Sequence, residues 1–383
     1  MNIMTILSNN WIYIAGFAMA FIISLLMTPL SKKFAFKVGA VAVPNARSMH
    51  QKPMPLAGGT AIVVGFAITV LILAPMMKSF RLENYVGLIL GSILITVVGL
   101  LDDIYDLNAR IKLFFQILAA LIVVFTGTTI ELISWPFASH GVLMLGPFSE
   151  IVTIIWIIGL TNAVNLIDGL DGLATGVSSI AALSLMFVSI LFKEPMVVLL
   201  TASLAGACIG FLPHNFNPAT IFMGDTGSTF LGFTLAVISA KGFIKSYTAI
   251  TIVVAILVLG LPIFDTSFAI LRRLINRQPV MKADRGHLHH RLVDKGYSHK
   301  RAVLTLYGIS GVFGIAGVLV AMNDTKLALF IVILMALVWA GDLWYTGREK
   351  KKALKTIGPE EVEEMVYADE FNAAMEEKDK DAI

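Results

Sequence analysis

The sequence predicts an all-α polytopic membrane protein with about eleven transmembrane helices. Of its 383 residues, 57% are hydrophobic and only 14% are charged, and the mean hydropathy is +0.82. This composition differs strongly from that of ordinary soluble domains. Apolar runs of about twenty residues, enough to cross a hydrocarbon core of roughly 30 Å, recur along the chain. The expected spans are 11–30, 58–77, 85–101, 111–127, 149–167, 173–192, 196–214, 226–244, 247–271, 302–322 and 326–345.

The basic residues are distributed unevenly between the loops that join these spans. If the N-terminus lies outside, the inner segments 31–57, 102–112, 272–301 and 346–383 together hold 23 of the 29 Lys and Arg residues. Positively charged loops stay in the cytoplasm, so we expect the C-terminus to be cytoplasmic. Every unusual polar cluster then follows an odd-numbered span, and the sequence predicts an active site on the cytoplasmic face.

Two domains are expected, an integral-membrane domain over residues 1–345 and a charged cytoplasmic tail over residues 346–383. No Lys or Arg precedes Lys32, so the first span lacks the basic region of a cleavable signal peptide and is expected to be retained. The single cysteine, Cys208, lies in an apolar run and excludes an internal disulfide.

A carboxylate cluster, Asp102, Asp103 and Asp106, ends the third expected span. Ionisable groups at a membrane boundary are costly to desolvate and usually have a function, so three together favour a cation or a proton as their ligand. Mg²⁺ suits oxygen ligands and bridges readily to phosphates. The alternative is a helix end whose carboxylates are simply solvated.

The second cluster follows the fifth expected span. Asn162, Asn165 and Asp168 recur at three-residue steps, which places them along one face of a helix. Two Asp-Gly pairs follow, Asp168-Gly169 and Asp171-Gly172, and a residue without a Cβ lets backbone amides approach a ligand closely. An ordinary turn also uses Asp-Gly, but it has no need of the asparagine face beneath it.

The third cluster, from Asn215 to Ser228, leads into the eighth expected span. Asp225, Thr226 and Ser228 are residue types that cap a helix start, and they are equally suited to holding a metal ion and phosphates there. Phe222 could stack on a flat base, although an aromatic residue at a membrane boundary is also a common anchor.

Two further basic loops complete the set. His287, His289 and His290 lie beside Arg285 in the longest inner loop, without the cysteine or His/Glu partners of a zinc site. Positive-inside bias gives no reason for histidines, and imidazole with guanidinium suits a polyanion such as phosphate. The loop with Lys52 precedes a Gly-Gly pair, where basic residues either hold a diphosphate or only determine topology.

In this order, the clusters resemble the polyprenyl-phosphate N-acetylhexosamine-1-phosphate transferases of the MraY superfamily. The resemblance covers about residues 12–345 and rests on five separated motifs. The Arg-Ser-Met-His-Gln-Lys-Pro and His-Leu-His-His runs look like the WecA/TagO branch. The resemblance implies a Mg²⁺-dependent enzyme, with Mn²⁺ as a substitute ion, that transfers GlcNAc-1-phosphate from UDP-GlcNAc to undecaprenyl phosphate and releases UMP. The product would initiate a cell-wall glycan such as wall teichoic acid or O-antigen.

The resemblance also implies roles for individual residues. Asp225 matches the Mg²⁺ ligand, and Asp102 matches the proposed base or nucleophile beside Asp103. The histidine motif is implicated in substrate binding and catalysis. The expected catalytic residues are Asp102, Asp103, His287, His289 and His290, and the expected substrate-binding residues are Lys52, Asn165, Leu166, Asp168, Gly169, Asp171, Asn215, Phe222 and Arg285.

Several alternatives stay open at this stage. Membrane prenyltransferases also use Asp-rich Mg²⁺ motifs, but they release pyrophosphate and have no need of the histidine loop. A transporter would place its polar groups near the bilayer midplane. The sequence does not decide whether the donor is UDP-GlcNAc or another UDP-N-acetylhexosamine, or which polymer is made downstream. It also leaves open whether transfer occurs by direct displacement or through a covalent intermediate. The expected location is the bacterial cytoplasmic (inner) membrane, with membrane lipids around the chain, no nucleic-acid partner, and a homodimer as one open oligomeric state.

Overall fold

The computed structural model describes residues 3–43, 53–134, 142–243, 251–278, 286–338 and 341. The chain divides into a compact unit, Met1–Ile331, and a C-terminal unit, Val332–Ile383. The predicted tail, 346–383, lies outside the described residues, so a boundary near residue 345 stays a prediction. All of the site geometry below belongs to the first unit.

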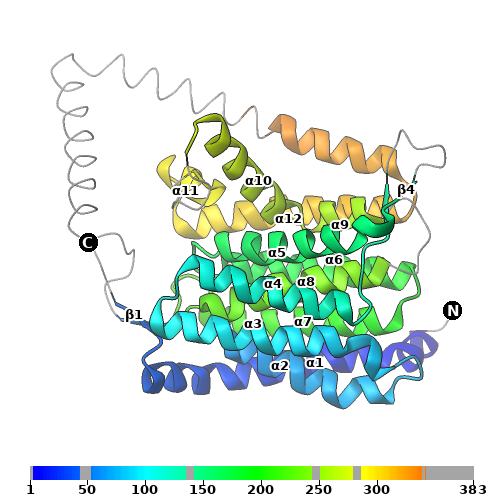
Figure 1. Cartoon of the computed structure of the whole chain (residues 1–383), viewed down its shortest axis with the longest axis horizontal. Coiled ribbons are helices and arrows are strands. Elements are labelled where there is room, and N and C mark those ends of the chain that lie inside the picture. The colour runs from blue at the N-terminus through cyan, green and yellow to red at the C-terminus, as the bar shows by residue number, and fades with distance from the viewer. Residues whose placement is uncertain are drawn as a thin grey trace. The chain divides into compact units, whose positions relative to one another are not determined.

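The fold is all-α, and its helices follow the predicted apolar runs (Figure 1). Within the described residues, seven helices are long and apolar enough to cross a membrane. A shorter apolar helix covers Thr325–Val338. The labelled helices are α1 Ile3–Val38, α2 Gly59–Leu73, α3 Val86–Tyr105, α4 Ala109–Phe125, α5 Ser149–Leu166, α6 Leu173–Leu191, α7 Pro195–Asn215, α8 Gly224–Phe243, α9 Thr251–Val258, α10 Gly260–Ile275, α11 Leu288–Asp294 and α12 His299–Ala321.

The expectation of one continuous span over 247–271 is wrong. The structure has two helices there, α9 and α10, which meet at Leu259 and Gly260. Pro262 stands in the first turn of α10, where its missing N–H is tolerated but where it would break a continuous helix. α10 carries Asp265 as well as Arg272 and Arg273, and is therefore less apolar than the long membrane-spanning helices.

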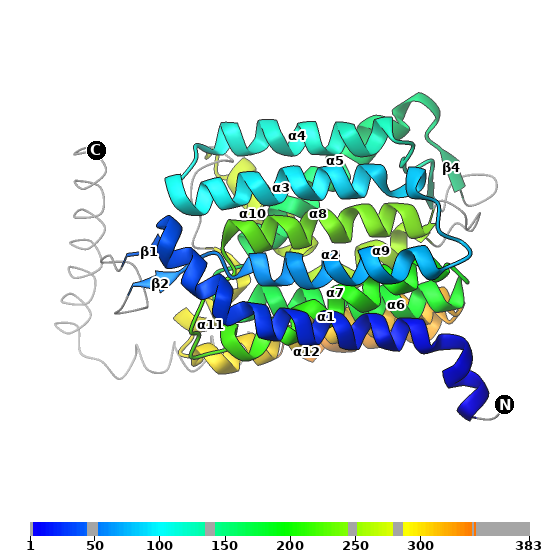
Figure 2. The ribbon, with the colours of Figure 1, turned by 90° about the horizontal axis from the view of Figure 1, so that it is seen from below.

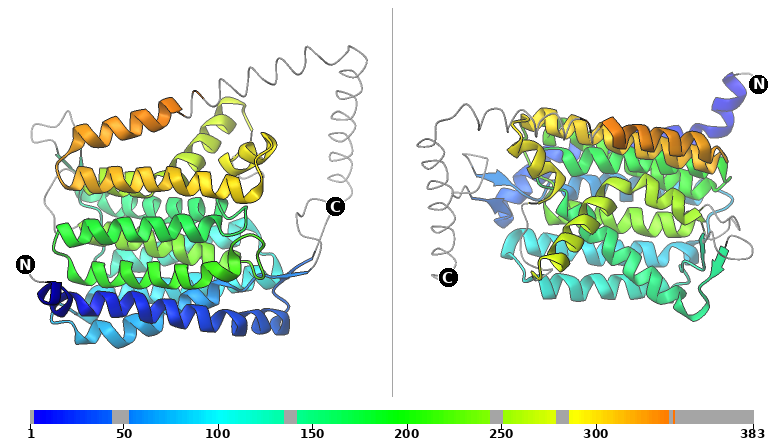
Figure 3. Two further views of the ribbon diagram at one scale, coloured as in Figure 1. Left: turned by 180° about the vertical axis from the view of Figure 1, so that it is seen from behind. Right: turned by 90° about the horizontal axis from the view of Figure 1, so that it is seen from above.

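α8 forms the centre of the bundle. It packs against α3 on one side and α5 on another, and it also contacts α2. Thr226 to Ala240 are all buried. α7 is similarly enclosed by α1, α2 and α6, and Figures 2 and 3 show these helices running side by side. The first amides of a helix have no partner within the helix, so the start of α8 needs acceptors from elsewhere.

Two short antiparallel strand pairs lie at opposite ends of the bundle (Figure 2). The pair β1 Val41–Ala42 and β2 Met54–Pro55 lies at the end where α3 finishes and α8 begins. The pair β3 Leu132–Ser134 and β4 Val142–Met144 lies at the other end. Three short 3-10 helices, Ala74–Met76, Leu82–Tyr85 and Gly146–Phe148, complete the structure.

The segment after β2 is tied to the loop before α8. Phe222 donates its backbone N–H to the carbonyl of Pro55, while Gly58 and Gly59 donate theirs to Phe222 and Met223, at 2.8–3.0 Å. These bonds hold Gly58 and Gly59 directly against the start of α8, where the two glycines pack against it.

We predict that Gly99→Ala destabilises the protein by about 1–3 kcal/mol, as overpacking does elsewhere. A Cβ at Gly99 would lie 2.7 Å from the carbonyl oxygen of Asp225 and 2.7 Å from Cα of Thr226, so α3 would be pushed away from α8. Gly159→Ala is the matched control, because nothing lies within 4 Å of its Cβ position. Thermal unfolding in detergent measures both; equal melting temperatures would contradict the close α3–α8 contact.

Candidate active site

The polar site begins where α3 supplies the cap of α8. The carboxylate of Asp103 accepts the backbone N–H of Asp225 at 2.7 Å and that of Thr226 at 3.0 Å, and also accepts the Thr226 hydroxyl. The first amides of a helix have no partner within it, and Asp103 supplies the acceptors for two of those of α8. Asp103 therefore joins α3 to α8 and has a structural task in addition to any chemical one.

Glycine is required where Asp103 meets the chain. Gly224 has φ of 68°, in the left-handed region, and a Cβ there would meet the carbonyl of Leu56 and both carboxylate oxygens of Asp103. Only a residue without a side chain combines this backbone with this approach. In the Met-Gly-Asp-Thr-Gly-Ser run, Gly224 therefore allows the carboxylate of Asp103 to reach the first amides of α8.

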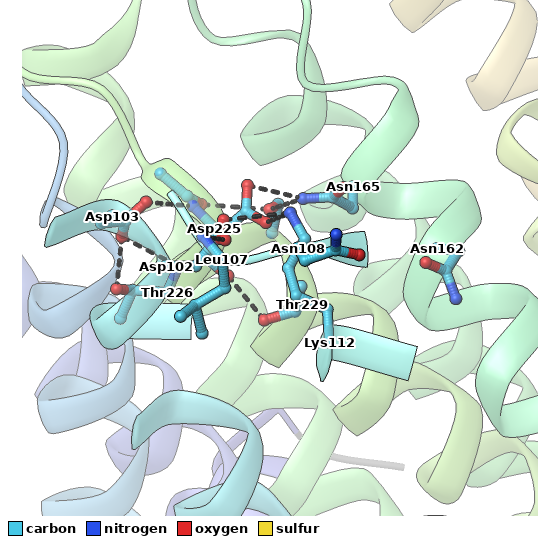
Figure 4. A network of polar contacts seen from close by, with 12 residues as sticks. Asp102, Asp103, Leu107, Asn108, Lys112, Asn162, Asn165, Asp225, Thr226 and Thr229 are labelled. Atoms are coloured by element: carbon cyan, nitrogen blue, oxygen red, sulfur yellow. Dashed lines mark hydrogen bonds and ion pairs between the residues drawn. The ribbon is translucent and has the colours of Figure 1, made fainter. Parts of the chain in front are cut away.

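Lys112 links the two carboxylates next to this cap (Figure 4). Its Nζ lies 3.0 Å from Oδ2 of Asp102 and 2.9 Å from Oδ2 of Asp225, and the three side chains are 27%, 9% and 25% exposed. Asp102 uses its other oxygen to accept the N–H of Leu107 at 2.8 Å. Two carboxylates from α3 and α8 thus share one ammonium group from α4.

Asn165, near the end of α5, completes the network around Asp225. Its amide nitrogen donates to Oδ1 of Asp225 at 3.0 Å and to the hydroxyl of Ser228 at 2.9 Å. Four helices, α3, α4, α5 and α8, therefore each contribute a side chain to one small polar centre. Asn162, one turn earlier on α5, instead pairs with Gln116 of α4, donating at 2.7 Å.

A cavity of about 850 Å³ opens over this centre. It brings together residues of all four predicted clusters, together with residues of the β1–β2 segment such as Met54 and Leu56. Of the predicted site residues, those that line it are Asp102, Asp103, Asn165, Asp168, Gly169, Asp171, Asn215, Phe222, Asp225 and His290. Leu166, His287 and His289 are not part of its lining, and Lys52 and Arg285 lie outside the described residues.

Two of the lining side chains hold loops in place. Asp171 accepts from the side chain of Asn217 at 2.9 Å and from the N–H of Ala219 at 3.1 Å. Asn215, 2% exposed, accepts from Thr175 and donates to the carbonyl of Ile221. Both residues fix the loop between α7 and α8 that carries Phe222, so they shape the cavity from behind.

Asp168 lies two residues beyond Leu166, the end of α5, so the expected helical face that runs through Asn162 and Asn165 ends before Asp168. Burial raises the pKa of its carboxyl to about 8, and repulsion by Asp225, Asp103 and Asp171 adds to the shift. A carboxyl in this environment holds a proton at neutral pH and acts there as a hydrogen-bond donor.

The histidine motif reaches the cavity from α11. The rings of His287 and His289 are stacked, with centroids 5.9 Å apart, and His289 contacts His290 at 4.2 Å. A Cβ at Gly169 would collide with Nε2 of His289, so the motif packs directly on the Asp-Gly turn. Burial, helped by His290, lowers the pKa of His289 to about 4, which keeps this imidazole neutral.

Sequence reasoning missed two residues of this assembly, Lys112 and Asp265. Lys112 stands at the edge of the fourth expected span and was counted as a basic loop residue. Asp265 lies inside the ninth expected span, and its carboxylate contacts His287 at 2.9 Å. A charge within an apolar run is costly without a partner, and that signal was present at both positions.

The sequence matches known proteins over most of its length. Residues 85–243 match the model of Glycosyl transferase family 4. The chain is 40% identical over 320 residues to the "Probable undecaprenyl-phosphate N-acetylglucosaminyl 1-phosphate transferase" of Bacillus subtilis strain 168, covering 82% of this chain and 88% of that protein. It is 34% identical over 350 residues to the decaprenyl-phosphate N-acetylglucosaminephosphotransferase of Mycolicibacterium smegmatis, covering 83% and 85%.

A third relative, from Thermotoga maritima, is named undecaprenyl-phosphate alpha-N-acetylglucosaminyl 1-phosphate transferase and is 32% identical over 298 residues, covering 77% of this chain and 87% of that protein. The helical bundle and its carboxylate-lined cavity define a multi-pass membrane transferase. The chain belongs to the family of polyprenyl-phosphate N-acetylglucosaminyl 1-phosphate transferases.

Lys112→Gln is expected to lower transferase turnover by about 10²-fold or more, the usual effect of removing one charge-stabilising donor from an active site. The substitution leaves Asp102 and Asp225 facing each other without a cation between them. Arg110→Gln removes an exposed charge from the same helix and serves as the control. Turnover measured in detergent with both variants is the test, and equal rates would remove the role given to Lys112.

Asp168→Asn should make stability less dependent on pH. Because the folded pKa of about 8 exceeds the ordinary aspartate pKa of 3.8, the folded state retains a proton that the unfolded chain loses, so wild-type stability falls as pH rises from about 4 to about 8. Asn resembles the protonated form and removes this loss. Melting temperatures at pH 6 and pH 9 measure the effect, with the exposed Asp294→Asn as control; parallel curves for Asp168→Asn and wild type would contradict it.

Proposed function

We propose that this chain transfers GlcNAc-1-phosphate from UDP-GlcNAc to undecaprenyl phosphate and releases UMP. The observation that carries the proposal is the single cavity in which Asp102, Asp225, Phe222 and His290 meet. Its volume of about 850 Å³ lies in the range of small-molecule sites and suits a nucleotide sugar. The names of the relatives supply the acceptor, a polyprenyl phosphate, and the transferred group.

The arrangement of the lining residues supports a division of the cavity. Phe222 offers an aromatic face for the uracil ring, and the turn at Gly169 leaves room for backbone contact with the nucleotide. His290 suits the phosphates, and the carboxylate pair with Lys112 marks where phosphoryl transfer would occur. A lipid phosphate reaches only the membrane boundary, so a cavity at the helix ends is where both substrates can meet.

The donor set at the centre suits Mg²⁺. The carboxylates of Asp102 and Asp225 are both within 3.0 Å of one ammonium group, which indicates a place where positive charge is strongly favoured. No group of three or more His, Cys, Asp or Glu in the described part of the chain could hold a metal by itself. A Mg²⁺ ion with one or two carboxylates completes its shell with water and substrate phosphates, and there it would offset charge on the leaving UMP.

The hydrogen bonds of Asp102 favour direct displacement. Both of its oxygens are engaged, one by the N–H of Leu107 and one by Lys112, which suits a positioning or proton-accepting group more than a nucleophile. An oxygen of the lipid phosphate would attack the β-phosphorus of UDP-GlcNAc. The bond from that phosphorus to the bridging oxygen breaks, and UMP leaves with this oxygen and its electron pair.

The proposed setting is the bacterial cytoplasmic membrane, with the cavity facing the cytoplasm, where the nucleotide sugar is available. There the product would be the first lipid-linked sugar of a cell-wall glycan, such as wall teichoic acid or O-antigen. The distribution of Lys and Arg among the loops supports this orientation.

The test is UMP release by the purified protein in detergent, with undecaprenyl phosphate and either UDP-GlcNAc or UDP-GalNAc, with and without Mg²⁺. We expect release with UDP-GlcNAc that requires both the lipid and the ion. Asp102→Asn and Asp225→Asn should each lower the rate by at least about 10²-fold, whereas Glu83→Gln, an exposed carboxylate at the far end of α3, should not.

Two results would contradict the proposal. If no UDP-sugar yields UMP in the presence of the lipid, the reaction is wrong. If Asp225→Asn retains full turnover, the carboxylate pair is not the reaction centre. Faster release with UDP-GalNAc would keep the reaction and replace the sugar.

A further inference from the structure

A buried contact between a carboxylate and an imidazole connects α10 to the histidine motif. Oδ2 of Asp265 lies 2.9 Å from Nδ1 of His287, and Oδ1 accepts the backbone N–H of Leu288 at 2.8 Å. Both side chains are only 7% exposed. α10 and α11 are adjacent in Figures 1 and 3, and residues 279–285 between them lie outside the described residues.

We propose that Asp265 is a positioning residue that fixes the histidine motif at the cavity through His287. The inference rests on the proposed function, because it assigns a task within that reaction. Asp265 is not part of the cavity lining, so any effect it has on turnover must be transmitted. Its two bonds are made to consecutive residues at the beginning of α11, and they therefore set both the place and the direction of that short helix.

The path from Asp265 to the cavity is a continuous series of contacts. His287 stacks on His289 with an interplanar angle of 10°, and His289 contacts His290, which lines the cavity. His289 is itself 2% exposed and packs against Gly169 of the Asp-Gly turn. A rotation of the His287 ring therefore cannot be absorbed by empty space and would displace the other two imidazoles.

The pair also decides which nitrogen of His287 carries a proton. Both oxygens of an ionised carboxylate only accept hydrogen bonds, so Nδ1 of His287 must be the donor. In a neutral ring, Nε2 is then the acceptor. Carboxylate partners orient catalytic and metal-binding imidazoles in this way, and their loss typically lowers activity about 10–100-fold. Burying Asp265 without such partners would be costly, which argues against an incidental contact.

Asp265→Asn tests the proposal with almost no change of shape. If the amide oxygen keeps the bond from Leu288, its NH₂ group faces Nδ1 of His287, and the proton of that ring must move to Nε2. If the amide turns over, the bond from Leu288 is lost instead. We expect UMP release to fall about 10–100-fold, with a folded protein by thermal unfolding. The exposed Asp294→Asn, on α11, is the matched control and should retain wild-type turnover.

A double-mutant cycle shows whether the effect passes through His287. If it does, Asp265→Asn causes no further loss in a His287→Ala background, because the group that it positions is already gone. Multiplying losses would mean that Asp265 acts independently and would overturn the proposal, as would wild-type turnover of Asp265→Asn. Should Asp265→Asn fail to fold, Asp265→Glu, which keeps both acceptor oxygens, enters the same cycle with the same criteria.

A second measurement does not depend on turnover. Nitrogen-15 spectra of the 7 histidines, with His287 assigned by substitution, report which ring nitrogen is protonated. We expect Nδ1 of His287 to be protonated in the wild type and its protonation to change in Asp265→Asn. An unprotonated Nδ1 in the wild type would overturn the pairing. If the wild type releases no UMP but its His287 is protonated on Nδ1 as expected, the proposed reaction is refuted and the Asp265–His287 contact is not.

Discussion

The site depends on the capping of α8 by Asp103. The first amides of α8 have no partner within the helix, and one carboxylate from α3 accepts two of them. Hydrogen bonds to charged groups contribute about 1.5–3 kcal/mol each. The same contact fixes the end of α3 against the start of α8, and so sets Asp102 and Asp225 beside each other, within reach of Lys112.

Carboxylates that look alike in the sequence do different things in this fold. Asp103, Asp171 and Asp265 accept hydrogen bonds from backbone amides and neighbouring side chains, and each holds a loop or helix start in position. Asp102 and Asp225 share a lysine and face the cavity. The acidic motifs therefore combine, within a few residues, carboxylates that support the fold and carboxylates that share a lysine at the cavity.

Two parts of the chain meet to form the cavity. One is the α3–α4–α5–α8 centre with its lysine and carboxylates, and the other is the histidine motif of α11. They touch where His289 packs on Gly169, a glycine of the turn that follows α5. Asp168 of this turn holds its proton at neutral pH, and the imidazole of His289 is neutral. The contact between His289 and Gly169 therefore brings two neutral groups near the Asp102–Asp225 pair.

The sequence by itself determined the membrane class, the course of the long apolar helices and the four clusters that converge, because apolar length and polar interruptions are local properties. It could not predict that Lys112 joins Asp102 to Asp225, that Asp265 holds His287, or that the span 247–271 is two helices. Those features depend on which helix ends lie within about 3 Å of one another, the reach of a hydrogen bond. Packing of distant segments decides that distance, so only the tertiary structure separates the supporting aspartates from the two that share Lys112.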